Sequence, residues 1–245
     1  MNVVAGKRAV TEAVRTRTAR EILVVADAET TQGLRAVLAA ARDAGVPIRR
    51  VSRADLDELA SDHRGVVARV RSDAATELSE RDLDGFPFED DALVVVLDGV
   101  TDPQNLGAAA RTAEAAGAAM LLTRTRRAAD VTPAAIRASS GALLHLPHAR
   151  VANIARALER LQRLGFWAVG LDDAAPHTIY EDPCPAGRVA LVAGSEGAGM
   201  ARLTRERCDA LVAIPMQGQV ASLNVSASLA AALFGYVLPS RRGPR

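Results

Sequence analysis

Five apolar runs of strand length, separated by helical segments, constrain the fold of this chain more than any other feature. The runs are ALVVVLDGV (92–100), AAMLLT (118–123), FWAVGL (166–171), RVALVAG (188–194) and ALVAIP (210–215). Continuous apolar runs of this length are typical of strands buried on both faces. Between them lie two segments of helical periodicity, NLGAAARTAEAAG (105–117) and VANIARALERLQRLG (151–165). The pattern predicts an α/β fold with a parallel sheet covered by helices.

The carboxyl ends of three of these strands are the expected place for a ligand. In open parallel sheets, ligands bind in the crevice beyond the carboxyl ends of the strands. We therefore look for functional residues after Leu97, after Ala193 and after Ile214.

Residues 1–72 carry a separate and smaller alternation of helices and strands. The helical segments are GKRAVTEAVR (6–15), TQGLRAVLAAARDAG (31–45) and RADLDELASD (53–62). The strand segments are EILVVA (21–26), VPIRRVS (46–52) and RGVVARV (64–70). This alternation predicts a small α/β unit. The unit shows no carboxylate pair, no nucleophile beside a base and no glycine-rich phosphate loop, so we expect no catalysis from it.

The charge distribution marks a boundary between the two patterns. Residues 1–72 carry a net charge of +4, residues 73–91 carry −7 and residues 92–245 carry +4, although the whole chain is at +1. We therefore expect two domains joined by an acidic linker at 73–91, in which Gly85 and Pro87 favour loops. A solvated loop inside one domain is the alternative. The two basic blocks are compatible with nucleic-acid binding.

Metal centres and secretion are disfavoured by the composition. Cys184 and Cys208 form no CxxC motif, and the four histidines are scattered with no HExxH motif, so no metal is expected. The chain opens with no charged region followed by an apolar one, which favours the cytoplasm.

Residues 210–240 contain no charged side chain. Polar residues interrupt this run too often for a membrane span, which needs about 20 mostly apolar residues. We expect a buried strand, a polar loop and then a helix over residues 221–238. An uncharged helix must bury most of its circumference, which places this one in the core or at a subunit interface.

Each segment after a strand end has an ordinary structural interpretation beside the functional one. Asn105 could cap a helix that exposes Arg111, and Ser222 could cap another. GSEGAGM (194–200) could be a plain turn, or a loop where glycine permits close approach to a ligand. Because Glu196 would repel a phosphate, that ligand is expected to carry positive charge or hydrogen-bond donors.

The three segments in series resemble one known group of enzymes. NLGAAARTAEAAG, GSEGAGM and IPMQGQVASLNVSASLA look like motifs 1, 2 and 3 of the SPOUT (α/β-knot) methyltransferases, TrmH branch. These enzymes transfer a methyl group from S-adenosylmethionine to a ribose 2′-hydroxyl of RNA. The resemblance covers about residues 92–238 and implies a trefoil-knot domain. Ser195 stands where alanine is common, and Gln104 where histidine can occur.

The match extends to the N-terminal region of branch members that act on ribosomal RNA. GKRAVTEAV, RGVVARV, LDGVTDPQNLGA and AGSEGAGMARLTRERCD are similar to their segments. The resemblance implies that residues 1–72 form an RNA-binding domain like ribosomal protein L30e. It implies a homodimer that methylates a guanosine in 23S rRNA. A tRNA or antibiotic-resistance rRNA methyltransferase, and a non-catalytic RNA-binding protein, are the alternatives.

The resemblance also implies roles for individual residues, with Arg111 as the catalytic one. A guanidinium is a poor base, since its pKa exceeds about 12, but it can bind a phosphate or stabilise a developing alkoxide. Glu196 is expected to orient Arg111 or a water. The positions that match the active site are Arg111, Asn105, Glu196, Ser222 and Asn224. Those that match the cofactor site are Gly194, Glu196, Gly197, Ile214, Met216 and Leu223.

Overall fold

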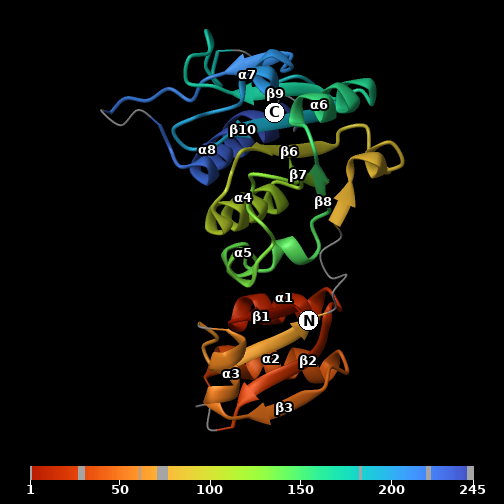
Figure 1. Cartoon of the computed structure of the whole chain (residues 1–245), viewed down its shortest axis with the longest axis vertical. Helices are drawn as coiled ribbons and strands as arrows, with labels where there is room; N and C mark the ends of the chain where they lie inside the picture. Colours follow the sequence, from red (N-terminus) through yellow and green to blue (C-terminus); the bar gives the residue numbers. More distant parts are fainter. Residues whose placement is uncertain are drawn as a thin grey trace.

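The computed structural model describes residues 2–26, 31–60, 62–70, 77–181, 184–218 and 222–241. These residues form two units, each built around its own sheet and stacked along the long axis of the molecule (Figure 1). Both units are α/β, which confirms the fold class expected from the sequence.

The C-terminal unit contains a seven-stranded sheet in which all neighbouring strands are parallel. Its order is β11 (Ala210–Val212), β9 (Trp167–Leu171), β10 (Val189–Gly194), β6 (Leu93–Asp98), β7 (Met120–Arg124), β8 (His148–Val151) and β5 (Glu77–Ser79). The five apolar runs form β6, β7, β9, β10 and β11, as predicted. The short strands β8 and β5, of which β5 is at the edge, were not expected.

Different helices cover the two faces of this sheet. The helical elements are α4 (Pro103–Ala115), α5 (Pro133–Ala138), α6 (Ile154–Arg163) and α7 (Arg202–Glu206), with the 3₁₀ turns η1 (Glu80–Leu83) and η2 (Ala142–Leu144). In β6, Val95 faces a core shared with α4 and α5, whereas Val94 and Val96 face a core shared with α6. Successive residues of one strand point to opposite faces, so an apolar strand such as β6 serves both cores.

The uncharged C-terminal helix begins later than predicted. α8 (Val225–Ala232) continues through a π-helical turn, η3 (Leu233–Val237), into α9 (Leu238–Arg241). The Asn224 side chain caps α8 by accepting a hydrogen bond from the Ser226 backbone N–H at 2.9 Å. Asn224 therefore takes the capping role considered for Ser222. None of the helices that the structure describes is long and apolar enough to cross a membrane.

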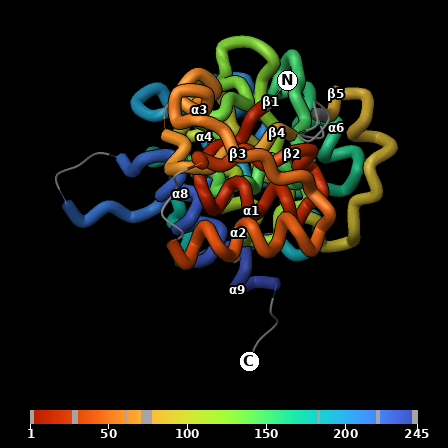
Figure 2. The backbone as a smooth tube through the Cα atoms, turned by 90° about the horizontal axis from the view of Figure 1, so that it is seen from below, coloured from red at the N-terminus to blue at the C-terminus, as the bar shows by residue number. Residues whose placement is uncertain are grey.

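The N-terminal unit is a four-stranded mixed sheet with helices on both faces. Its order is β1 (Asn2–Ala5), β4 (Val66–Val70), β2 (Ala19–Val25) and β3 (Ile48–Val51), and its helices are α1 (Lys7–Arg15), α2 (Gln32–Asp43) and α3 (Arg53–Leu59). β1 was not predicted; it pairs with β4 in antiparallel fashion. Figure 2 shows α1 and α2 on one side of the sheet and α3 on the other. Accordingly, Leu56 of α3 packs in a cluster separate from that of α1 and α2.

The acidic segment differs from the expected linker over residues 77–91. Glu77–Ser79 forms β5, and the side chain of Leu83 is buried against the α6 face of the large sheet. Glu80 accepts two hydrogen bonds of 2.7 Å from Arg156, which lowers the pKa of its carboxyl. Here acidic residues mark pairing with the arginines of α6 rather than a free connection. Residues 73–76 lie outside the described part of the chain.

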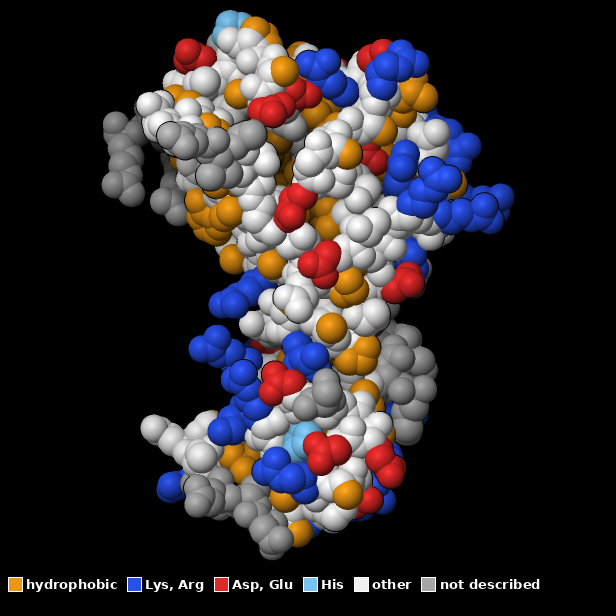
Figure 3. Space-filling model, turned by 60° about the vertical axis from the view of Figure 1, so that its left-hand side comes forward, with side chains coloured by type: hydrophobic (Ala, Val, Ile, Leu, Met, Phe, Trp, Pro, Cys, Tyr) orange, Lys and Arg blue, Asp and Glu red, His pale blue; other side chains and the backbone are white. Residues whose placement is uncertain are grey.

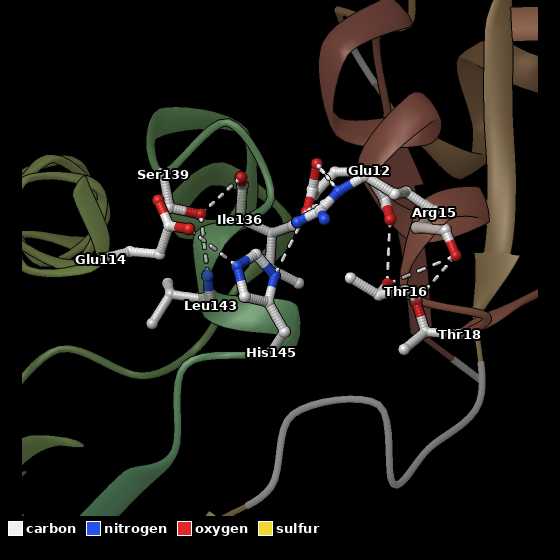
Figure 4. Close-up of polar contacts among 10 residues, drawn as sticks. Glu12, Arg15, Thr16, Thr18, Glu114, Ile136, Ser139, Leu143 and His145 are labelled. Atoms are coloured by element: carbon white, nitrogen blue, oxygen red, sulfur yellow. Dashed lines mark hydrogen bonds and ion pairs between the residues drawn. The ribbon is translucent and has the colours of Figure 1, made fainter. Parts of the chain in front are cut away.

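The two units touch where α1 meets the segment after α5. His145 lies between a carboxylate from each unit: its Nδ1 is 3.4 Å from Glu12 Oε1, and its Nε2 is 3.4 Å from Glu114 Oε1 (Figure 4). Gly141 passes so close to α1 that a Cβ there would lie less than 3.0 Å from the Glu12 side chain. The N-terminal unit is therefore packed against the segment that follows helix α5.

A buried histidine makes the stability of the C-terminal sheet depend on pH. His148 is 1% exposed, and its Nε2 lies 2.8 Å from Thr123 Oγ1 on the neighbouring strand. Burial, aided by the nearby charge of Arg150, lowers the pKa of His148 to about 4. The neutral ring is therefore the form that the fold accommodates.

We expect acid to remove the stability that depends on neutral His148. Between pH 6.5 and 4 the unfolded chain binds a proton that the folded chain does not, so stability is full above this window and falls as pH drops through it. The loss is roughly 3 kcal/mol at pH 4. Urea titrations of wild type and His148→Leu at pH 7 and pH 4 measure it. Equal losses in both proteins would contradict the assignment.

Candidate active site

The segments after β6, β10 and β11 meet at the carboxyl edge of the large sheet. β10 lies between β6 and β9, and β11 pairs with the far side of β9. α4 starts at this edge, where Asp102 accepts a hydrogen bond of 2.9 Å from the Gln104 backbone N–H and Pro103 occupies the first turn. Asp102 is thus the cap of α4, a role considered for Asn105.

Three polar side chains, one from each segment, form a hydrogen-bonded cluster. Asn105 Nδ2 donates to Glu196 Oε1 at 3.0 Å. Asn224 Nδ2 donates to Asn105 Oδ1 at 2.9 Å and also to Glu196 Oε1. These residues are 119 positions apart at the extremes, so the fold has brought the three sequence motifs into direct contact.

The cluster is held in place by the local structure of each element. Asn224 Oδ1 accepts from the backbone N–H of Ser226 at 2.9 Å and from its hydroxyl at 2.7 Å, which fixes the orientation of the amide. Asn105 lies in the first turn of α4. Glu196 is exposed on the loop after β10 and accepts from both amides through one oxygen. One carboxylate therefore joins two amides at a surface open to a ligand.

The loop after β10 folds back tightly on its own strand. Ser195 N–H donates to Gly199 O at 3.1 Å, and Gly199 N–H donates to Ser195 O at 2.9 Å. A Cβ on Gly194 would lie less than 3.0 Å from backbone atoms of Gly199 and Met200. Gly197 and Gly199 have φ values of +77° and +65°, which only glycine adopts without strain. The glycines of this segment thus serve a close approach of backbone to backbone.

A buried carboxylate that the sequence analysis did not select supports the same loop. Asp98, at the end of β6, is 2% exposed, and its Oδ2 accepts from the Ala201 backbone N–H at 2.8 Å. Its other oxygen lies 3.2 Å from Arg124 Nε at the end of β7. An acidic residue closing an apolar strand is the signal that could have identified it.

The remaining expected cofactor positions follow β11. Ile214 and Met216 are half-buried, and Leu223 is exposed at 37%. Ser222 is exposed, and its side chain makes no hydrogen bond within the described residues. These apolar side chains belong to the segment between β11 and α8, which also carries Asn224 of the polar cluster.

Arg111 lies on the third turn of α4 and is exposed. Its guanidinium makes no hydrogen bond or ion pair with any part of the chain that the structure describes. The structure contains no contact between Arg111 and Glu196, which accepts hydrogen bonds from the two amides instead. The other expected role of Glu196, to orient a water, stays a prediction. Arg111 is thus a cation available to a ligand. Within the described residues, no group of three or more His, Cys, Asp or Glu side chains could hold a metal.

Both units of the chain match models of known protein families, and the whole chain is similar to known proteins. Residues 92–234 match the model of the SpoU rRNA Methylase family, and residues 3–74 match that of the RNA 2′-O ribose methyltransferase substrate binding domain. A curated relative from Photobacterium profundum, 23S rRNA (guanosine-2′-O-)-methyltransferase RlmB, is 42% identical over 217 residues, 87% of each chain. The protein of the same name from Haemophilus influenzae is 46% identical over 197 residues, 79% of each chain.

A solved structure supports the same relationship. The SpoU methyltransferase AviRb from Streptomyces viridochromogenes, in complex with the cofactor AdoMet, is 29% identical, with a TM-score of 0.76. The similarity covers 96% of this chain and 88% of that one. The two matching models together span both units of the fold. The chain therefore belongs to the SpoU rRNA methylase family.

Proposed function

We propose that this protein methylates a guanosine ribose of 23S rRNA at the 2′-oxygen, with S-adenosylmethionine as the methyl donor. The observation that carries the proposal is the meeting of Asn105, Glu196 and Asn224 at the carboxyl edge of the sheet. Arg111, six residues past Asn105 on α4, has no partner among the described residues. The names of relatives that are 42% and 46% identical over most of their length support it. The cytoplasm is the compartment where we place this reaction.

The residues at this edge fit S-adenosylmethionine. Its adenosine moiety needs apolar contacts and backbone hydrogen-bonding groups, which Ile214, Leu223 and the loop after Gly194 offer. Its sulfonium carries a positive charge, which suits a site where the Glu196 carboxylate is exposed. We assign Gly194, Glu196, Gly197, Ile214, Met216 and Leu223 to this cofactor. When bound, it supplies the methyl group.

The protein's own part in the reaction is to align and polarise the RNA. The cofactor would supply the methyl group to the 2′-oxygen, whose hydroxyl proton would pass to solvent. Arg111 donates hydrogen bonds to the 2′-oxygen or the adjacent phosphate, which stabilises the developing negative charge. Asn105 and Asn224 hold the ribose, and Ser222 lies two residues before Asn224 in the sequence. A guanidinium fixes direction as well as charge, because its donors form a planar fork.

The N-terminal unit is assigned to RNA binding. Its residues 1–72 carry a net charge of +4 and have no constellation suited to catalysis. The match of residues 3–74 to a substrate-binding model supports this division of labour. Figure 3 shows Lys and Arg side chains gathered around the hollow between the two units, where a polyanion could contact both.

The direct test is to map ribose methylation in RNA from cells with and without the gene. We expect one guanosine of 23S rRNA to lose its 2′-O-methyl group in the deletion strain and to regain it when purified protein and S-adenosylmethionine are added. Loss of a methyl group from tRNA instead would overturn the assignment of the substrate. Unchanged RNA of every kind would overturn the assignment of an enzyme.

We further propose that the protein is a homodimer joined through α8 and η3. Leu229 and Leu233 point into the core, whereas Ala227, Phe234 and Gly235 are exposed on the same uncharged segment. Phe234 is 49% exposed on this uncharged segment, and apolar side chains that are exposed together mark interaction surfaces. A two-fold axis would place this apolar face against its own copy. The amino end of the same helix carries Asn224, so the interface would adjoin the active site.

A charge on this face should separate the subunits. We expect Phe234→Arg to be monomeric in sedimentation and to lose methyl transfer, because a buried arginine without a partner is strongly unfavourable. Ala231→Arg, at a half-buried position, should act in the same direction. Tyr180→Arg, at a residue that is 70% exposed outside this segment, is the control and should remain dimeric. A wild-type protein that is monomeric at micromolar concentration would refute the dimer.

A further inference from the structure

A loop rich in arginine lies at the same edge of the large sheet as the candidate active site. We call it the β7 loop (residues 125–130), because it follows β7 at the carboxyl end of that strand. β7 pairs with β6 in parallel, so the loops after these two strands leave the sheet at the same edge. The Ala129 backbone N–H donates to Val100 O at 2.8 Å, which ties the β7 loop to the segment that leads into α4 and Asn105.

Two arginines of the β7 loop present charge to solvent. Arg126 and Arg127 are exposed, and neither makes a hydrogen bond or an ion pair with any residue that the structure describes. Arg124, at the end of β7, differs from them, because its Nε lies 3.2 Å from Oδ1 of the buried Asp98. Arg126 and Arg127 therefore offer two positive charges to an anion from outside the chain.

The β7 loop is held in a fixed shape at both ends. Nη2 of Arg150, on the neighbouring strand β8, lies 2.9 Å from Asp130 Oδ1 and donates to Thr125 O at 3.2 Å. The Thr125 backbone N–H donates to Val151 O at 2.9 Å. Arg127 has a φ of +55°, in the left-handed region that is unfavourable for a residue with a Cβ. Such a conformation persists where the surrounding structure fixes it, so the two cations are carried by a preorganised loop.

Charge is distributed unevenly along this edge of the sheet. On the far side of the active site, β9 is followed by Asp172, which accepts a hydrogen bond from Arg205 Nε at 2.6 Å, and by the exposed Asp173. Residues 210–240, which contain β11 and α8, have no charged side chain. A polyanion that reaches the polar cluster is therefore attracted to the β7 side of the edge and not to the β9 side.

The exposure of both arginines favours a polyanion over a small anion. An exposed ion pair with a single small anion contributes little, because water and salt screen it. A nucleic-acid backbone instead presents one phosphate after another, and each cation that binds it releases a condensed counterion. The β7 loop therefore suits an RNA strand better than a free carboxylate or phosphate.

We propose that the β7 loop binds the phosphate backbone of the RNA substrate beside the target nucleotide, with Arg126 and Arg127 as the contacts. The inference rests on the proposed function for the identity of the RNA. Phosphate contacts fix the register and the orientation of a nucleic acid without reading its sequence. The β7 loop thus positions the strand at the active-site edge, while the N-terminal unit binds the RNA elsewhere.

The test is a binding experiment that does not depend on methylation. Labelled fragments that together cover 23S rRNA are titrated with the full-length protein, and the Kd of the tightest fragment is measured at about 50 to 200 mM salt. The loop variant is Arg126→Gln with Arg127→Gln, and the control variant is Arg163→Gln with Arg207→Gln. Each removes two positive charges. The control residues follow α6 and α7 to the amino ends of β9 and β11, at the opposite edge of the sheet.

We expect the loop variant to raise Kd about 5- to 30-fold at about 100 mM salt. The slope of log Kd against log salt should fall by about 1.4 to 1.8, the value for two phosphate contacts. The control variant should raise Kd less than about threefold and change the slope by less than about 0.5. Equal losses in the two variants overturn the proposal, and so does a loop variant that binds RNA as the wild type does.

A lysine variant separates charge from the shape of the loop. Arg126→Lys with Arg127→Lys should keep most of the wild-type salt slope, because lysine also binds phosphate as a point charge. If the lysine variant bound RNA as weakly as the loop variant, the charge of the two arginines would not be what the RNA needs, and the proposal would be wrong.

Uncharged methylphosphonate groups, placed one at a time in the fragment, locate the phosphates that the β7 loop contacts. One or two of them should weaken the binding of the wild type and of the control variant but leave the binding of the loop variant unchanged, since its contacts are already lost. These phosphates should lie within a few nucleotides of the guanosine that becomes methylated. The same sensitive phosphates in all proteins, or sensitive phosphates far from that guanosine in the sequence, contradict the proposal.

Failure of the β7 loop assignment and failure of the proposed function are distinguishable in this design. A wild-type protein that binds a fragment but never methylates it refutes the proposed function, and the loop is then judged by the variants and their salt slopes. A loop variant that loses affinity for S-adenosylmethionine while its RNA affinity is unchanged assigns the loop to the cofactor and overturns the proposal. A wild-type protein that binds no fragment of 23S rRNA refutes the assignment of the loop to that RNA.

Discussion

Replacing Arg111 by alanine is expected to reduce methyl transfer by about 100- to 1,000-fold, the usual scale for losing a donor to a developing oxyanion. The affinity for S-adenosylmethionine should stay within a few-fold of wild type, because the guanidinium is assigned to the RNA. Nothing in the described fold depends on this side chain, which is exposed and unpartnered. Single-turnover assays and calorimetric titration with the cofactor measure the two quantities.

Arg111→Lys separates charge from geometry. A lysine ammonium is a point charge with three rotating donors, so it should restore only a small part of the lost rate. Arg163→Ala, at the end of α6, is the matched control, because it removes an exposed helical arginine from the other face of the sheet. If the lysine variant turned over at close to the wild-type rate, the directional role assigned to Arg111 would be wrong.

The large sheet was predictable because its central strands are apolar on both faces. β6 and β10 are buried over nearly their whole length, and only such strands show a continuous apolar run. β8 and β5 lack this signal. β8 contains His148 and Arg150, and β5 has three residues whose strand conformation depends on pairing with β8. Short polar strands form only by pairing with a neighbouring strand. That strand is distant in the sequence, so a local stretch of residues does not reveal the pairing.

Charge misled the interpretation of residues 77–91 for a related reason. A run of acidic residues indicates a solvated segment only when no cations lie opposite, and here α6 presents Arg156 and Arg160 to Glu80 and Asp84. These pairs join residues 76 positions apart. The apolar signal within the same run, Leu83, was the better guide to its burial.

The candidate site was predictable by position but not by contact. The resemblance selected Asn105, Glu196 and Asn224, and the fold joins all three. It also suggested a Glu196–Arg111 contact that the structure does not contain. The partner of the Glu196 carboxylate, whether Arg111 or the two amides, depends on the distances between elements in the fold. The spacing of residues in the sequence does not contain those distances. Asp98 was missed because its partners are a backbone N–H and a residue on the next strand.

Gly194→Ala is expected to disrupt the cofactor site without changing any polar side chain. A Cβ at this position would lie less than 3.0 Å from backbone atoms of Gly199 and Met200, and backbone cannot rotate aside as a flexible side chain can. The loop must therefore move, at a cost typical of overpacking, about 1–3 kcal/mol. In a chain of 245 residues this lowers the melting temperature by roughly 2–10 °C.

The same displacement should weaken S-adenosylmethionine binding by about 10- to 100-fold, since one or two hydrogen bonds from the loop backbone would be lost. Gly85→Ala is the matched control, because its Cβ would meet nothing within 4 Å. Calorimetric titration and thermal melting of the two variants separate the effects. A Gly194→Ala protein that melts early but binds the cofactor normally would show that the tight turn serves the fold alone. A folded Gly194→Ala variant that loses affinity would show that cofactor binding needs the close approach between Gly194 and Gly199. The polar side chains of Asn105, Glu196 and Asn224 are unchanged in both variants, so they would not explain the loss.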